Sequence, residues 1–121
     1  MTVYAQPGTP DSPTAFRSRY ENFVGGSWVP PTKGQYFENK SPVTGEVFTE
    51  VARSTAEDVD LAIDAAWKAF DSWGKTSPTE RAAVLLKLAD AMEVNLERFA
   101  VAERWDNGKP VRECLAADIP Q

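Results

Sequence analysis

The sequence contains no histidine and only one cysteine, Cys114, among its 121 residues. Without histidine the chain cannot form Ser-His, Cys-His or His-metal arrangements, which leaves carboxylates, lysines, tyrosines and one thiol for chemistry. A single cysteine excludes an internal disulfide framework and is typical of a reducing compartment. The chemistry open to this chain by itself is therefore narrow.

Long apolar runs and clusters of basic residues are also missing. No apolar run approaches the roughly 20 residues that span a bilayer, and residues 1–7 lack the basic start and apolar stretch of a secretory signal. The 13 Lys and Arg residues are interspersed among 18 Asp and Glu residues, giving a net charge of -5. General affinity for nucleic acid needs a clustered basic face. We therefore expect a soluble cytoplasmic protein with neither a nucleic acid nor a membrane as its partner.

Prolines and glycines divide the first half of the chain. Prolines at positions 7, 10 and 13 predict an extended arm over residues 1–21. The β-prone pairs Phe23-Val24 and Trp28-Val29 flank Gly25-Gly26, which indicates a first hairpin. A second hairpin is predicted to pair Tyr36–Lys40 with Val47–Ala52 across a loop that contains Pro42 and Gly45.

The second half has helical periodicity. Thr55 with Asp58, or Ser54 with Glu57, forms a capping box that predicts a helix start, and Gly74 is a suitable end. Ser77-Pro78-Thr79-Glu80 predicts the start of a second, long helix that continues to about Trp105. We expect the two amphipathic helices to pack as an antiparallel pair. The aromatic residues of their apolar stripes are then core residues: Trp67, Phe70, Trp73 and Phe99.

The segment Trp105–Pro110 closes the second helix and opens a third. Asn107-Gly108 indicates a left-handed turn, and Pro110 suits the first turn of a helix that would remain incomplete at residue 121. Asp106 lies at the negative end of a helix dipole, an unfavourable place that costs about 0.3–1 kcal/mol. Its compensation could come from Lys109 or Arg112, from the N-terminus of the next helix, or from a bound cation.

The order and spacing of several short segments resemble the N-terminal part of NAD(P)-dependent aldehyde dehydrogenases. Tyr4–Gly8 and Trp105–Pro110 look most like the bacterial acetaldehyde dehydrogenase branch. The segments that carry the family resemblance are Asn22–Val29, Phe37–Pro42, Thr44–Val47, Ala56–Asp60, Ala65–Ala66, Thr79–Arg81 and Asp106–Pro110.

The resemblance implies an α/β fold in which residues 22–121 form an incomplete coenzyme-binding domain. It also implies oxidation of an aldehyde, such as acetaldehyde, to the acid with NAD or NADP in a homo-oligomer. A cysteine thiolate attacks the aldehyde, hydride passes to the nicotinamide, and a glutamate-activated water releases the acid. In the family pattern all these residues lie after position 121. We therefore expect no catalytic or coenzyme-binding residue here and an inactive fragment, whose partner is the rest of the chain.

Cys114 is not a candidate for the missing nucleophile. Its place in a first helical turn beside Arg112 could lower its pKa, but a nucleophile also needs a base, an oxyanion site and a substrate pocket. The family nucleophile belongs to a later motif. We expect Cys114 to be a packing or surface thiol.

One site does carry over from the resemblance, namely a monovalent-cation site. Relatives build it from backbone carbonyls before the Ser-Pro pair and from the acid of the Asp-Asn-Gly-Lys motif, which here are Asn39, Lys40 and Asp106. Hard cations prefer oxygen ligands. The alternative to an enzyme fragment is a self-standing noncatalytic domain that binds a partner through its helix pair.

Overall fold

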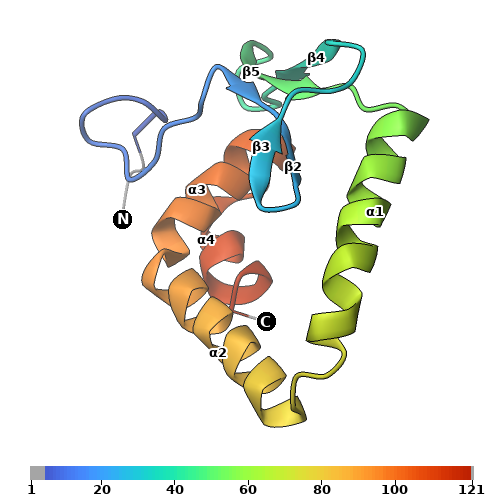
Figure 1. Cartoon of the computed structure of the whole chain (residues 1–121). Coiled ribbons are helices and arrows are strands. Elements are labelled where there is room, and N and C mark those ends of the chain that lie inside the picture. The colour runs from blue at the N-terminus through green and yellow to red at the C-terminus, as the bar shows by residue number, and fades with distance from the viewer. Residues whose placement is uncertain (1–4, 121) are drawn as a thin grey trace.

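The computed structural model describes residues 5–120 and shows a mixed α/β arrangement, as predicted (Figure 1). Residues 1–4 and 121, the outer ends of the predicted arm and of the segment 22–121, lie outside the described residues. The strands are β1 Arg19–Tyr20, β2 Asn22–Val24, β3 Ser27–Val29, β4 Tyr36–Lys40 and β5 Val47–Ala52. The helices are α1 Ala56–Trp73, α2 Pro78–Val94, α3 Leu96–Asn107, α4 Val111–Glu113 and the π-helix η1 Cys114–Asp118.

Both predicted hairpins are present. β4 and β5 pair antiparallel, with Tyr36 opposite Ala52, over the bounds that the sequence indicates. β2 and β3 pair antiparallel around Gly25 and Gly26, whose φ angles are 60° and 86°. Glycine adopts such left-handed angles without the steric cost that a Cβ would bring, which explains the Gly-Gly turn.

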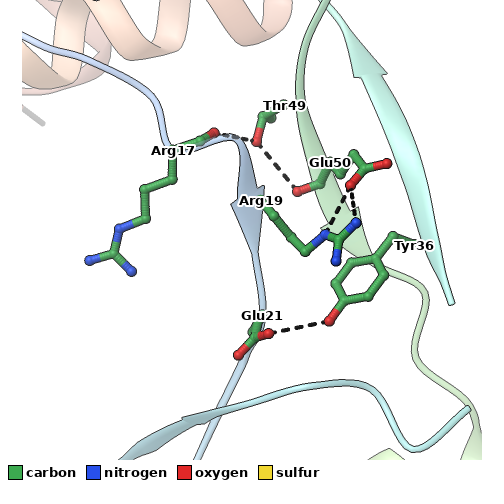
Figure 2. Close-up of polar contacts among 6 residues, drawn as sticks. All are labelled: Arg17, Arg19, Glu21, Tyr36, Thr49 and Glu50. Atoms are coloured by element: carbon green, nitrogen blue, oxygen red, sulfur yellow. Dashed lines mark hydrogen bonds and ion pairs between the residues drawn. The ribbon is translucent and has the colours of Figure 1, made fainter. Parts of the chain in front are cut away.

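Strand β1 adds a parallel partner that the antiparallel pattern did not predict. It pairs with β5, so the sheet order is β1-β5-β4. Side chains from the neighbouring strands hold it in place, because Thr49 Oγ1 donates to the carbonyl of Arg17 at 2.8 Å and the Arg19 guanidinium pairs with Glu50 (Figure 2). The Tyr36 hydroxyl donates to Glu21 at 3.3 Å (Figure 2). A strand of two residues is too short to show a periodicity in the sequence, so these long-range contacts determine the pairing of β1 with β5.

The predicted capping boxes start α1 and α2. Thr55 and Asp58 form the first one, and Thr55 N donates to Asp58 Oδ2 at 2.7 Å. Ser77 and Glu80 form the second: the Glu80 amide donates to Ser77 Oγ at 3.2 Å, and Ser77 N donates back to Glu80 Oε2 at 3.0 Å. Gly74 is the C-cap of α1, as predicted. Short polar side chains that satisfy free amides therefore set both helix starts.

The second long helix is interrupted, which corrects the prediction of one continuous helix. Asn95 separates α2 from α3, with φ and ψ of -107° and 19°. Its Nδ2 donates to the carbonyl of Ala91 at 2.8 Å. Asparagine side chains compete with the helical backbone hydrogen bonds in this way, and the apolar periodicity on either side does not reveal the break.

The two long helices do not pack against each other, which also corrects the prediction. They meet only at the turn between Trp73 and Pro78 and diverge from it (Figure 1). The aromatic residues assigned to a core are exposed instead: Trp67 by 66%, Phe70 by 58%, Trp73 by 48% and Phe99 by 42%. Periodicity identifies which side of a helix is apolar but not whether this chain supplies the surface that covers it.

The buried apolar residues gather where α3 meets α4 and η1. Ala100 and Cys114 are fully buried there, and Val111 is 8% exposed. Val101 on α3 is also fully buried but is not part of this cluster. Leu115 and Ile119 pack against this cluster. We call α3, α4, η1 and the sheet beside them the core unit. Its core is small because α1 and α2 contribute no buried apolar side chain.

None of the helices in residues 5–120 combines the length and the hydropathy of a membrane-spanning segment.

Candidate functional site

The end of β4 is joined to the C-terminal end of α3. Asn39 Nδ2 donates to Asp106 Oδ1 at 2.7 Å. The fully buried Ser41 donates through Oγ to the carbonyl of Trp105 at 2.6 Å and accepts from the amide of Val43 at 3.2 Å. A helix end leaves its last carbonyls without partners, and Ser41 satisfies one of them. We call this region the β4–α3 junction.

The junction brings together two of the three predicted cation-site residues through their side chains. Asn39 and Asp106 are in direct contact, whereas Lys40 is exposed at the last position of β4. The β4–β5 ladder is irregular between Asn39 and Lys40, and such a bulge disturbs regular pairing of the backbone groups. The prediction used only the carbonyl of Asn39, so it missed the amide that contacts the acid.

The Asn39 amide is the side-chain partner that the structure gives to Asp106. The two basic candidates lie elsewhere: Lys109 Nζ is 3.1 Å from Asp118 and 3.8 Å from Glu103, and Arg112 pairs with Glu113. The hydrogen bond and charge of Asp118 raise the pKa of Lys109. Lys109 therefore ties η1 to α3 rather than neutralising the acid at the junction.

Gly108 forms the predicted left-handed turn after α3, with a φ of 82°. A Cβ at this position would lie 3.0 Å from Cγ of Pro42 and 3.4 Å from its Cβ. The loop between β4 and β5 thus packs directly on the helix end. Glycine is needed here for its conformation and also for the close approach.

Cys114 is a packing thiol, as predicted. It is fully buried in the core unit. Burial is the largest cause that raises its pKa, and the charges of Asp118 and Glu103 raise it further. The suggestion that its helical position and Arg112 could lower the pKa of Cys114 is wrong, because desolvation disfavours the thiolate. A buried neutral thiol is a poor nucleophile, so the site contains no activated cysteine.

Asp58 has a second role that the sequence did not reveal. Besides capping α1, it accepts hydrogen bonds at Oδ1 from both the amide and the hydroxyl of Thr32, each at 2.7 Å. The side chain is 6% exposed. Hydrogen bonds from Thr55 and then Thr32 lower its pKa from 3.8 to about 2. The Asp58 carboxylate therefore links the β3–β4 connection to the start of α1. The sequence predicts its capping of α1 but not its hydrogen bonds with Thr32.

Asp58 should make stability depend on pH in the acid range. Because its folded-state pKa of about 2 is below the ordinary 3.8, its contribution is complete above roughly pH 4 and is lost as the pH falls toward 2. We expect Asp58→Asn to lower Tm at neutral pH and to flatten the dependence of Tm on pH between about 2 and 4. Thermal unfolding followed by circular dichroism checks this, with the exposed Asp60→Asn as control. Parallel curves for Asp58→Asn and the parent would contradict it.

The glycine turns offer no cradle for a coenzyme pyrophosphate. Gly25 and Gly26 connect two antiparallel strands, and Gly45 lies between β4 and β5. A dinucleotide site instead places its glycines between a strand and the N-terminus of a helix. Across residues 5–120 there is likewise no group of three or more Cys, Asp or Glu side chains suited to a metal ion. The turns at Gly25-Gly26 and Gly45 therefore do not suit the pyrophosphate of NAD.

Comparison with known proteins gives a consistent result. The sequence model of the aldehyde dehydrogenase family matches residues 28–121. An aldehyde dehydrogenase of Deinococcus radiodurans is 68% identical over 117 residues, which are 97% of this chain and 23% of that protein. An acetaldehyde dehydrogenase of Pseudomonas aeruginosa is 59% identical over 98% of this chain and 23% of its own length.

The fold is similar to that of solved structures, including an aldehyde dehydrogenase from Burkholderia cenocepacia with a TM-score of 0.83 at 39% identity, over 86% of this chain and 21% of that one. The structure of PnpE in complex with nicotinamide adenine dinucleotide superimposes with a TM-score of 0.81 at 36% identity, over 84% of this chain and 21% of that one. The chain thus spans about a quarter of the length of the relatives that it matches. The family match covers residues 28–121, which contain β4, β5, both capping boxes and the helix ends described above, and this chain therefore belongs to the aldehyde dehydrogenase family.

Proposed function

We propose that this chain is the N-terminal part of an NAD(P)-dependent aldehyde dehydrogenase, which oxidises an aldehyde to the carboxylic acid, and that it is inactive by itself. The observation that carries the proposal is the family match over residues 28–121 in a chain that spans only 23% of its Deinococcus radiodurans relative. The buried, neutral Cys114 supports the second half, because it leaves the described segment without an activated thiol.

NAD is the coenzyme that we propose, bound by the rest of the enzyme. The support comes from PnpE, which was solved with nicotinamide adenine dinucleotide, and from the hairpin position of Gly25 and Gly26, which does not suit a pyrophosphate. When bound, NAD would supply the hydride acceptor. The residues described here would contribute the core unit and the β4–α3 junction to the folded enzyme.

Acetaldehyde is the substrate to test first. The relative from Pseudomonas aeruginosa is named an acetaldehyde dehydrogenase and is 59% identical. We further propose a cytoplasmic homo-oligomer in which residues 22–121 belong to the coenzyme-binding domain and residues 1–21 form an arm. The absence of a membrane-spanning helix within residues 5–120 is compatible with this location.

The test is a hybrid enzyme. This chain replaces the matched segment of the Deinococcus radiodurans aldehyde dehydrogenase, and NADH formation from acetaldehyde is compared between the hybrid and the isolated chain. Activity in the hybrid alone supports the proposal, and an inactive but folded hybrid overturns it. Longer aldehydes in the same assay establish the substrate class.

We also propose a monovalent-cation site at the β4–α3 junction, with Asp106 and the backbone carbonyls of Asn39 and Lys40 as ligands. The oxygen-rich set suits a hard cation, and the irregular ladder between Asn39 and Lys40 supports the use of strand carbonyls. The Asn39 amide contacts Asp106 Oδ1. A cation would therefore bind through the other carboxylate oxygen, or the amide would turn away.

Sodium or potassium should stabilise the hybrid enzyme, and Asp106→Ala should abolish this effect. A cation at about 100 times its Kd adds about 2.7 kcal/mol to the free energy of unfolding. Tm measured with and without the cation, at constant ionic strength set with a bulky organic cation, gives the effect. Asp71→Ala, an exposed acid on α1, is the control. Equal cation dependence in Asp106→Ala and the parent would exclude the site.

A further inference from the structure

The carboxylate of Asp106 carries a charge that the described residues do not neutralise. It lies one residue before the end of α3, where the helix dipole disfavours a negative charge. Asn39 Nδ2 donates to its Oδ1 at 2.7 Å, but an amide brings a hydrogen bond and no positive charge. Within residues 5–120, no lysine or arginine forms an ion pair with it. The amide therefore satisfies one oxygen and leaves the charge in place.

The surroundings of this contact favour a cation. Asn39, Glu103 and Asp106 line one cavity of about 320 Å³. Among residues 5–120, the lining of this cavity includes two carboxylates and no basic side chain. A concave surface lined by charges of one sign raises the local concentration of the opposite ion. Glu103 has Lys109 Nζ at 3.8 Å, so Asp106 is the carboxylate of the cavity that has no basic partner.

The Asn39 side chain can leave Asp106 without opening the β4–α3 junction. Asn39 is half-buried and Asp106 is exposed, so solvent reaches their contact. The backbone is held separately, because the fully buried Ser41 donates to the carbonyl of Trp105 at 2.6 Å. Rotation of one side chain is therefore enough to free Oδ1 of Asp106.

We propose that the Asn39 amide is an internal competitor for the cation at Asp106 and that it sets how tightly the junction binds sodium or potassium. The inference rests on the cation site proposed above and gives the side chain of Asn39 a role in it. Without a cation, the amide holds Asp106 and the junction forms. Binding then requires the amide to turn away, because an N–H donor and a cation compete for the same carboxylate oxygen. The apparent Kd is the intrinsic Kd divided by the fraction of molecules whose amide has turned away.

Thermal unfolding of the hybrid enzyme tests this competition without using activity. Tm is measured over a series of sodium and potassium concentrations, at constant ionic strength set with a bulky organic cation. Asn39→Ala removes the competitor. We expect the Tm of this variant to be lower than that of the parent without sodium or potassium and equal to it at saturation. Its half-saturating cation concentration should be roughly three- to tenfold lower, because every molecule is then competent to bind.

Two further variants separate competition from damage to the junction. Asn39→Asp replaces the donor with a second carboxylate, and the two like charges destabilise the cation-free state. We expect this variant to have the lowest Tm without sodium or potassium and the largest increase in Tm with either ion. Asn107→Ala is the matched control, because Asn107 Nδ2 also donates to a carboxylate, that of Glu103. Its Tm should fall by the same amount at every cation concentration.

Three results would overturn the competition. Parallel dependence of Tm on cation concentration in Asn39→Ala and the parent would retain the cation site and remove the role of Asn39. A weaker response in Asn39→Ala would make its side chain a ligand rather than a competitor. No response in the parent or in any variant would refute both the site and the competition. Aldehyde oxidation is measured separately, so none of these results depends on the proposed activity.

Discussion

The hybrid enzyme should oxidise acetaldehyde with NAD at least about a thousandfold faster than the isolated chain. Enzymes accelerate their reactions about a millionfold or more, and this acceleration needs a nucleophile, a base and a bound coenzyme. The described segment offers a buried Cys114 with a raised pKa and no cradle for the coenzyme. We propose that the Deinococcus radiodurans sequence supplies those groups in the hybrid, and 68% identity over the exchanged segment favours correct packing.

Initial rates of NADH formation, followed by absorbance, measure this difference. The Deinococcus radiodurans enzyme without its matched segment is the control, and we expect it to be inactive because its own apolar surfaces are then uncovered. A kcat for the hybrid within about tenfold of the intact relative would show that this chain substitutes fully. Turnover by the isolated chain at a rate near that of the hybrid would refute the assignment of catalysis to the rest of the enzyme.

Val101→Asp should abolish cooperative folding of the core unit. Val101 is fully buried on α3, and an unpaired carboxylate in an apolar interior costs several kcal/mol. Domains of this size are stable by only about 5–15 kcal/mol, and the small core leaves this chain toward the lower end. We expect no unfolding transition for this variant in urea, measured by circular dichroism and tryptophan fluorescence.

Val94→Asp is the matched control, because it introduces the same acid at a residue that is 85% exposed. It lies in the last turn of α2, where an acid meets the negative end of the helix dipole at a cost of about 0.3–1 kcal/mol. The control should therefore retain its transition with a slightly lower midpoint. Similar midpoints for the two variants would show that Val101 does not lie in a core in solution.

Local features of this fold were predictable from sequence, and long-range ones were not. The capping boxes at Thr55 and Ser77 have nearby partners, so a few residues of sequence determine them. The break at Asn95 depends on one side chain competing with the backbone. The parallel pairing of β1 with β5 joins Arg19 to Glu50, and two residues carry no pattern that specifies such a partner.

The candidate site was predictable only in outline. The Asp-Asn-Gly-Lys segment indicated a helix end with an acid that needs compensation, and Gly108 adopts the predicted left-handed turn. The partner of Asp106 was not among the basic candidates, because the contact with Asn39 spans 67 positions. The link from Asp58 to Thr32 was missed for the same reason, since it crosses 26 positions. Distance along the chain, rather than residue type, limited the inference.

The β4–α3 junction also determines when this segment can finish folding during synthesis. Ser41 reaches Trp105 across 64 positions, and the core around Cys114 needs residues that leave the ribosome after α1 and α2. Helices α1 and α2 emerge earlier and form from local contacts. Translation proceeds at about 5–20 residues per second, so the apolar surfaces of α1 and α2 stay exposed to solvent until the later residues have been made. We therefore expect the nascent chain to be open to chaperone binding during that interval, through the exposed apolar side chains of α1 and α2.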